Sequence, residues 1–266
     1  MKIRNLHRSV CMALTTVLLM FIAATAMAED AKKEAKAMEA EGNIATSWVI
    51  WPKAGQAAQF EAAIKKYAAW RKTAGEKFNW QIYQPVVGSD LAHYVIRSGQ
   101  HTWQDMDTNA AWEVQAKANE EYDKQVGAFT DRAEHYFSES DAKHSHWIDS
   151  PDYKYYGVSS YRKVPGTYKE RLDALNKIQK AVEDEKWAYP YEISDAIGGD
   201  NPLQIVTPMK SYADMADPDP SLMKILAKSL GSDEAAEATM KQFGSTVERS
   251  HYSIYVHRAD LSTPKN

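Results

Sequence analysis

The feature that most constrains the fold is an order of secondary-structure elements that occurs twice along the 266 residues. In the first copy, a β-branched and aromatic run at 44–51 predicts a strand. An amphipathic helix over 56–73 follows, with one stripe of side chains at helical spacing, Phe60, Ile64, Tyr67 and Arg71. The copy continues with predicted strands at 79–87 and 92–98, a longer helix through 114–129 and a strand at 135–138. The order is βαββαβ.

The second copy begins at position 155. Its predicted elements are strands at 155–162, 187–193, 203–207 and 251–258 and a helix through 172–182. A helical region over 221–247 is expected to break at Gly231, where Ser232 or Asp233 can cap a new start. Three matches link the copies: Trp103-Gln-Asp-Met-Asp107 with Tyr212-Ala-Asp-Met-Ala216, Gly55 with Gly166, and His135-Tyr136 with His251-Tyr252. Such repetition indicates a tandem duplication.

The element order, the aromatic-x-Asp-Met boundary after the third strand and the duplication resemble the dimeric α/β-barrel superfamily over residues 44 to 262. The resemblance implies an α+β fold, in which two ferredoxin-like modules face each other through antiparallel sheets as a barrel. With two modules in one chain the barrel could close within a monomer, and a homodimer is the other expectation. The superfamily includes cofactor-free monooxygenases, haem-degrading enzymes and haem enzymes of the chlorite dismutase type, so the resemblance implies a fold rather than one activity.

The N-terminus has the pattern of an export signal. Basic residues at 2, 4 and 8 precede an apolar stretch at about 11–24, and Ala26-Met27-Ala28 supplies a small-x-small cleavage pattern. We expect a Sec-type signal peptide that is cleaved after Ala28, which would place the mature chain in the periplasm or outside the cell. The predicted organisation is a signal peptide at 1–28, a charged tether at 29–42, a first module at 43–148 and a second module at 149–266.

Loss of the leader changes the charge and removes the only cysteine, Cys11. The remaining chain has 29 basic and 36 acidic residues, a net charge of −7. A negative chain without a basic run is a poor partner for nucleic acid or anionic lipid. No later apolar stretch approaches the roughly 20 residues of a membrane-spanning helix. A small-molecule ligand is therefore the expected partner.

Alternation along the strands predicts which side chains face the barrel interior. Tyr94 and Ile96 match Leu203 and Ile205, and we assign these apolar pairs to the helix-covered face. The candidate ligand-binding residues of the interior are His93, Arg97, His135, His251, Tyr255 and His257. Imidazoles, a guanidinium and aromatic walls suit a partly apolar ligand with a polar or anionic group. Alternatively, His135 and His251 cap their strands, and His93 and Arg97 form a polar seam between the modules.

Motifs with a defined chemistry are few. His144 and His146 have a spacing that can chelate a transition metal, but a solvated linker is favoured and no metal is predicted. The sequence contains no Gly-x-Ser-x-Gly, Gly-x-Gly-x-x-Gly or His-Glu-x-x-His motif. No catalytic residue is therefore predicted and no cofactor is required, with haem as a minority alternative.

These observations predict an exported small-molecule-binding protein with a pocket inside the barrel or between its sheets. The first alternative is an oxidoreductase or monooxygenase-like enzyme of the same fold, dependent on haem or on no cofactor. The second alternative is a protein-interaction module without a ligand.

Overall fold

The structure is a computed structural model and describes residues 42–263. The chain from Asn43 onward forms one compact unit. The elements of its first half are β1 (Ile44–Pro52), α2 (Ala57–Thr73), β2 (Gln81–Val87), β3 (Tyr94–His101), α3 (Trp103–Ala116), α4 (Ala118–Gln125) and β4 (Thr130–Ser140). Those of its second half are β5 (Tyr155–Lys163), α5 (Tyr168–Asp184), β6 (Glu192–Ile197), β7 (Leu203–Met209), α6 (Leu222–Leu230), α7 (Asp233–Ser245) and β8 (Val247–His257). Both halves have the predicted βαββαβ order.

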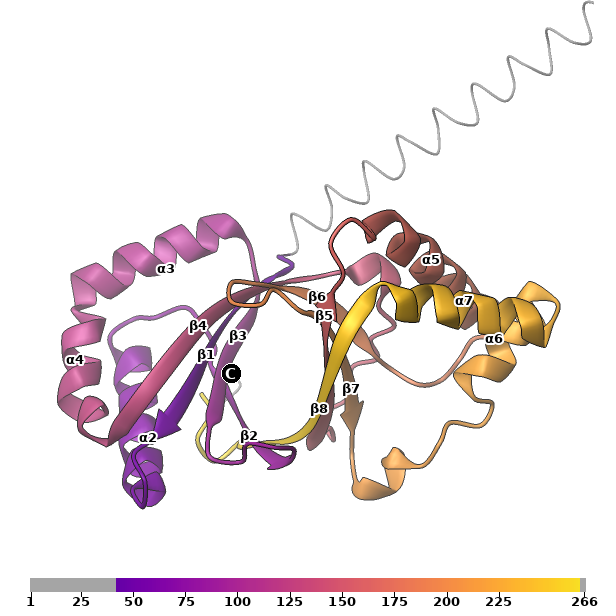
Figure 1. Cartoon of the computed structure of the whole chain (residues 1–266). Coiled ribbons are helices and arrows are strands. Elements are labelled where there is room, and N and C mark those ends of the chain that lie inside the picture. The colour runs from indigo at the N-terminus through magenta and orange to yellow at the C-terminus, as the bar shows by residue number, and fades with distance from the viewer. Residues whose placement is uncertain (1–41, 264–266) are drawn as a thin grey trace, which may run out of the picture. The chain divides into compact units, whose positions relative to one another are not determined.

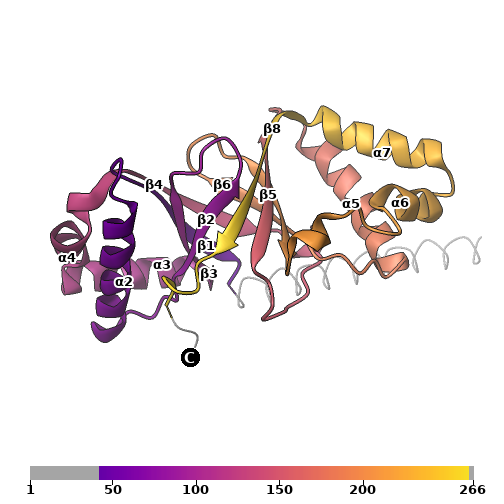
Figure 2. The same cartoon turned by 90° about the horizontal axis from the view of Figure 1, so that it is seen from below.

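The eight strands of this region form one closed antiparallel barrel in the order β1-β3-β2-β8-β5-β7-β6-β4. Each half contributes four neighbouring strands, and the halves meet where β2 pairs with β8 and where β4 pairs with β6. The helices lie outside the barrel, with α2, α3 and α4 on one side and α5, α6 and α7 on the other (Figures 1 and 2). The expected dimeric α/β-barrel fold is confirmed, and the barrel closes within one chain.

Alternation on β3 sorts side chains as predicted. Tyr94 and Ile96, which are 2% and 8% exposed, pack in the core beneath the helices. Val95 and Arg97 line the barrel interior. This alternation defines a helix-covered face and an interior face for each strand paired with β3.

The cores beneath the two sets of helices differ in composition. The core of the first half is rich in aromatic side chains, including Phe60, Tyr67, Phe78, Trp80 and Tyr94. The core of the second half is mainly aliphatic, including Leu175, Ile178, Val182, Ile225 and Leu226.

Three local features differ from or sharpen the prediction. The helix expected through 114–129 is broken at Lys117, whose φ of 55° is left-handed, and Val114, which was expected to pack, is 81% exposed. The strand expected from Trp187 begins only at Glu192, since Pro190 lacks the N–H that a strand ladder needs. The expected break at Gly231 is present, and the Ser232 hydroxyl accepts a hydrogen bond from the N–H of Ala235.

The predicted signal peptide at 1–28 and almost all of the tether at 29–42 lie outside the described residues. Within residues 42–263, no helix is long and apolar enough to cross a membrane.

Candidate functional site

The barrel interior holds a cavity of about 640 Å³, which we call the lumen cavity. Its wall comes from all eight strands and carries four serines, four tyrosines, four valines, three carboxylates and one guanidinium. Small-molecule sites in proteins usually occupy roughly 300–1,000 Å³, so the lumen cavity is large enough for a ligand.

Arg97 and Tyr255 are the two predicted site residues that line the lumen cavity. Nη2 of Arg97 lies 3.7 Å from Oε1 of Glu192, which comes from β6 in the other half. Burial raises the pKa of the Tyr255 phenol, so this side chain is neutral and can donate a hydrogen bond.

His93 lies just before β3, beside the lumen cavity. It is 8% exposed, and its Nε2 is 3.3 Å from the Tyr255 hydroxyl. Burial lowers the pKa of His93, although the Asp90 carboxylate, 3.5 Å from Nδ1, partly opposes this effect. The imidazole of His93 is therefore neutral.

The two predicted histidines of β8 lie on its interior face but do not line the lumen cavity. His251 is opposite Ser160 of β5, is exposed, and has Nε2 3.0 Å from the Ser253 hydroxyl. His257 is opposite Tyr83 of β2, and its Nε2 is 2.8 Å from Oε1 of Gln81. The structure therefore places Arg97 and Tyr255 on the wall of one cavity and His93 against Tyr255, whereas His251 and His257 lie outside the cavity lining.

The prediction that His135 faces the interior is wrong. His135 pairs with Trp48, and its Nε2 is 2.7 Å from the Thr46 hydroxyl on the helix-covered face. The cause is a one-residue error in aligning the two halves. Trp48 pairs with Ile96, and its counterpart Ser159 pairs with Ile205.

The partner of Ser159 in β8 is Tyr252, so His135 corresponds to Tyr252 and not to His251. A shift of one residue turns every side chain of a strand to the other face.

The two ring nitrogens of His144 contact other side chains and do not face His146 as a chelating pair would require. His144 is 3% exposed, and its two ring nitrogens contact the Asp141 carboxylate at 2.6 Å and the Asn176 amide oxygen at 3.1 Å. The backbone of His146 pairs with Tyr191. Among residues 42–263 there is no group of three or more metal-ligating side chains. The segment is also not the solvated linker that was favoured, since His144 is buried against α5.

A second cavity, of about 130 Å³, lies between the sheet and the helices of the first half. We call it the helix-side cavity. Its walls include the rings of Trp48, Trp80, Tyr67 and Tyr122, and its polar lining includes Arg71, Glu113 and Asn119. Trp48 is 39% exposed and Ala133 is exposed, so the cavity reaches solvent near these residues.

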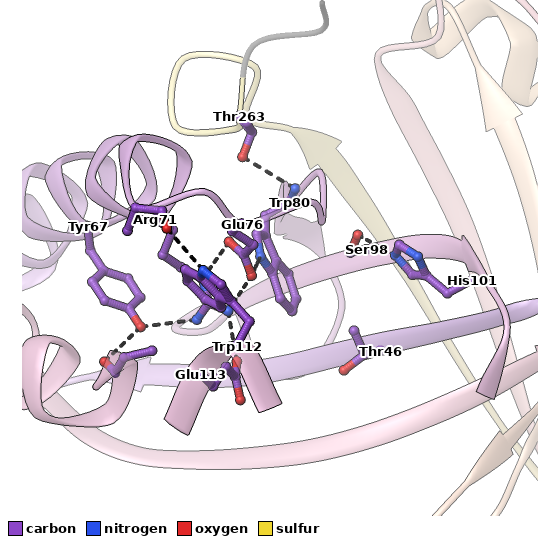
Figure 3. Close-up of polar contacts among 12 residues, drawn as sticks. Thr46, Tyr67, Arg71, Glu76, Trp80, Ser98, His101, Trp112, Glu113 and Thr263 are labelled. Atoms are coloured by element: carbon purple, nitrogen blue, oxygen red, sulfur yellow. Dashed lines mark hydrogen bonds and ion pairs between the residues drawn. The ribbon is translucent and has the colours of Figure 1, made fainter. Parts of the chain in front are cut away.

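Arg71 organises the polar side of the helix-side cavity (Figure 3). Its Nε donates to Oε2 of Glu76 at 2.6 Å, and its Nη2 donates to Oε1 of Glu113 at 2.7 Å. Its Nη1 donates to the Tyr67 hydroxyl at 3.0 Å, and Trp80 Nε1 donates to Glu76 at 2.9 Å. Burial opposes the Arg71 charge, but the hydrogen bonds and charge of Glu76 outweigh it and raise the pKa of Arg71.

The second half has no counterpart of this cluster among its described residues. Helices α2 and α5 have the same length and each begins two residues after its matched glycine, Gly55 or Gly166. Position 71 therefore corresponds to Val182, which is 0% exposed, and position 76 to Trp187, which is 9% exposed. A buried ion pair in one half is replaced by apolar packing in the other.

The sequence does not predict the helix-side cavity, although it contains one signal of it. Arg71 occupies the fourth position of the apolar stripe on the first helix, where a charged side chain is unexpected. A charge at a core position needs buried partners. One of those partners, Glu113, is 42 residues away and on another helix, so the sequence alone does not identify it.

Neither cavity offers a histidine ligand for haem, the minority cofactor expected from the sequence. No histidine lines either the lumen cavity or the helix-side cavity, whereas histidine is the usual proximal ligand of haem iron in globins and peroxidases. The helix-side cavity is also far smaller than cofactor sites usually are.

No protein-family model and no curated protein matches the sequence. Solved structures do match the fold. A proposed monooxygenase from Fusobacterium nucleatum matches with a TM-score of 0.52 at 8% identity, covering 80% of this chain and 91% of that chain. A proposed monooxygenase from Lactobacillus acidophilus matches with a TM-score of 0.52 at 6% identity, covering 82% and 94%.

An arginine-to-alanine mutant of chlorite dismutase from Candidatus Nitrospira defluvii matches with a TM-score of 0.51 at 8% identity, covering 86% and 97%. At these identities the likeness shows the fold: this chain has the dimeric α/β-barrel fold of proteins that include proposed monooxygenases and chlorite dismutase.

Proposed function

We propose that the protein is an oxidoreductase that oxidises a small, single-ring aromatic substrate in the helix-side cavity, without haem. The observation that carries the proposal is the buried Arg71–Glu76 pair, joined by the partly exposed Glu113, beside an aromatic cavity, where the matched positions 182 and 187 of the second half hold Val182 and Trp187. Buried ion pairs cost desolvation energy and are weak contributors to stability, so a cluster kept in one of two duplicated cores is better explained by function. The names of the two proposed monooxygenases support the same reaction class.

The size of the cavity limits the substrate. A volume of about 130 Å³ is close to that of the roughly 150 Å³ apolar cavity that binds benzene in an engineered protein. The indole rings of Trp48 and Trp80 provide flat apolar walls, against which an aromatic ring packs well. A phenol or a dihydroxybenzene fits these limits.

Glu113 is the residue that we expect to accept the phenolic proton. Its carboxylate lines the cavity, and its side chain is 30% exposed, so it can reach a substrate and later release the proton to solvent. Arg71 donates a hydrogen bond to one of its oxygens and so fixes its position. A deprotonated phenol is electron-rich and is the form that dioxygen can oxidise.

The reaction balances without an external reductant. A phenol and one dioxygen give a quinone and one water: one oxygen atom is added to the ring, and the ring supplies the two electrons that reduce the other. The residues of this chain bind the ring and take the proton from the hydroxyl.

The experiment is oxygen consumption by the purified protein with phenol, catechol and hydroquinone in the presence of EDTA. We expect oxygen uptake with quinone absorbance, and a kcat about 100-fold lower for Glu113→Gln. Glu120→Gln, on an exposed side chain of the neighbouring helix, is the control and should match the wild type. No uptake with any of the three substrates, or equal rates for Glu113→Gln and wild type, would contradict the proposal.

A second candidate function is binding of a small ligand in the lumen cavity, favoured by its volume of about 640 Å³. Native mass spectrometry of the protein purified from its own host would detect a retained ligand.

We also propose export through cleavage after Ala28. N-terminal sequencing of the mature protein should begin at Glu29, and a mature chain that begins at Met1 would contradict it.

A further inference from the structure

We infer that the lumen cavity binds an α-amino acid with an apolar or aromatic side chain, with Arg97 holding its carboxylate and Glu192 its ammonium group. This inference rests on the second candidate function, binding in the lumen cavity. It is independent of the oxidoreductase proposal, which concerns the helix-side cavity.

Arg97 has hydrogen-bonding capacity that the described residues do not use. A guanidinium carries five N–H donors, yet the side chain of Arg97 makes no hydrogen bond within residues 42–263. Its one charged contact there is Glu192, 3.7 Å away, which is longer than a hydrogen bond. A guanidinium on a cavity wall with free donors is suited to binding a planar carboxylate through two parallel hydrogen bonds.

Gly99 makes room for the observed position of this guanidinium. A Cβ atom at position 99 would lie 2.7 Å from Nη1 of Arg97, closer than real Cβ contacts allow. Any larger residue here would therefore displace the guanidinium. Because Gly99 has no side chain, the Arg97 guanidinium can occupy this position.

The remaining charges of the lumen cavity exclude a simple anion as the preferred ligand. Three carboxylates line the cavity, Glu134, Glu192 and Asp200, against the single guanidinium of Arg97. A ligand with only a negative charge would meet a net repulsive wall. A ligand that also carries a positive charge satisfies both signs. The Glu192 carboxylate, whose Oε1 accepts a hydrogen bond from the Ser140 hydroxyl at 2.6 Å, is the acidic group nearest Arg97.

The separation of the two charged residues limits the spacing of the ligand charges. Because Arg97 and Glu192 are 3.7 Å apart, one ligand can contact both only if its own charged groups are close neighbours. In an α-amino acid the ammonium and carboxylate groups are attached to the same carbon atom. The termini of a peptide are too far apart for this arrangement.

The walls around this charged pair favour an apolar side chain on the ligand. Val49, Val95, Val158 and Val206 line the same cavity. The rings of Tyr83 and Tyr156 meet edge to face at 5.2 Å, and burial raises the pKa of both phenols, so both are neutral. An apolar or aromatic side chain would pack against these groups.

The test is isothermal titration calorimetry of the full mature chain with L-phenylalanine, L-tyrosine, L-tryptophan and L-leucine. We expect saturable binding of at least one of them. For L-phenylalanine, the one-charge analogues phenethylamine and 3-phenylpropionate should bind at least about tenfold more weakly. Arg97→Gln and Glu192→Gln should each weaken amino-acid binding by a similar factor.

Gly99→Ala keeps both charges but displaces the guanidinium, and it should also weaken binding. Arg162→Gln is the matched control, because Arg162 is likewise 3.7 Å from a carboxylate, that of Glu248, but is exposed outside the lumen cavity. Circular dichroism melting shows that each variant is folded. No saturable binding of any of the four amino acids, unchanged binding by Arg97→Gln, or equal binding of 3-phenylpropionate would overturn the inference. Oxygen uptake is a separate measurement, so either proposal can fail alone.

Discussion

The two halves share an element order but differ in what lies beneath their helices. In the second half, Val182 and Trp187 fill the space between α5 and the sheet with apolar side chains. In the first half, the corresponding positions hold Arg71 and Glu76, and a cavity of about 130 Å³ remains beside them. Two copies of one fold can therefore differ beneath their helices, with apolar side chains packed in one copy and polar groups beside a cavity in the other.

The strands show the same asymmetry at a smaller scale. Thr46 and His135 in the first half hydrogen-bond on the helix-covered face, and their counterparts in the second half are Gly157 and Tyr252. A Cβ atom at position 157 would lie 2.5 Å from the Tyr252 hydroxyl, so Gly157 is needed for the Tyr252 ring. Each half has its own matched pair, so exchanging single residues between halves should be poorly tolerated.

The largest effect should come from breaking the buried ion pair. Glu76→Ala should destabilise the protein by about 3–5 kcal/mol, because it leaves the Arg71 guanidinium buried without its main partner. The double variant Arg71→Val, Glu76→Trp, which copies the second half, should lose less than Glu76→Ala alone. Equilibrium denaturation in urea measures both. A double variant that is less stable than Glu76→Ala would show that the ion pair itself stabilises the first half.

A smaller difference should separate two matched core residues, Ile64 of α2 and Leu175 of α5. Both are buried, at 4% and 6% exposure, but Ile64 already borders the helix-side cavity. Leu175→Ala should cost about 3–4 kcal/mol and Ile64→Ala about 2 kcal/mol, because truncation beside an existing cavity removes fewer contacts. Equilibrium denaturation in urea would check this, by comparing the transition midpoints of variants whose denaturant slope (m value) is the same as that of the wild type. Equal losses would mean that the two cores are packed equally well.

The smallest effect should be on the pH dependence of stability, where two buried histidines act in opposite directions. Burial lowers the pKa of His93 in the first half below its usual 6.5. The unfolded chain therefore binds the proton first, and the free energy of unfolding falls as the pH drops below about 6.5. His93→Asn should reduce that loss.

His144, which packs against α5 of the second half, behaves in the opposite way. The hydrogen bond that the His144 ring donates to the Asp141 carboxylate raises the pKa of His144 in the folded state. Its contribution to stability is therefore complete below about pH 6.5 and is lost as the pH rises through the folded-state pKa. His144→Asn should destabilise the protein more at pH 5.5 than at pH 8.5, as measured by denaturation at each pH. A constant difference would contradict the assignment.

The fold was predictable because its signals are local and repeated. Apolar side chains at Tyr94 and Ile96 alternate with Val95 and Arg97, and such a period of two defines both faces of a strand without knowledge of its partners. The same reasoning correctly directed Arg97 and Tyr255 into the lumen. It failed for His135, because its face was inferred from an alignment of the two halves that was one residue out of register.

The helix-side cavity was less predictable, for a physical reason. Arg71 and Glu76 are only five residues apart, but Glu113 is 42 residues from Arg71 on another helix, and only tertiary packing brings it to the pair. A charged residue within an apolar stripe shows that a buried partner is needed, but it does not show which carboxylate supplies it. The helix-side cavity exists because the side chains between α2 and the sheet do not fill the space there, and no sequence pattern predicts such a gap.

The central claim is that the helix-side cavity of the first half binds a small aromatic ring. The most direct measurement is a titration of phenol into protein labelled at the isoleucine δ1 methyl groups, followed by NMR. Ile50, Ile64, Ile82 and Ile96 line the helix-side cavity, whereas Ile178, Ile193 and Ile225 lie in the filled core of the second half. The account predicts saturable shifts confined to the first group. Shifts in the second group, or none in the first, would contradict it.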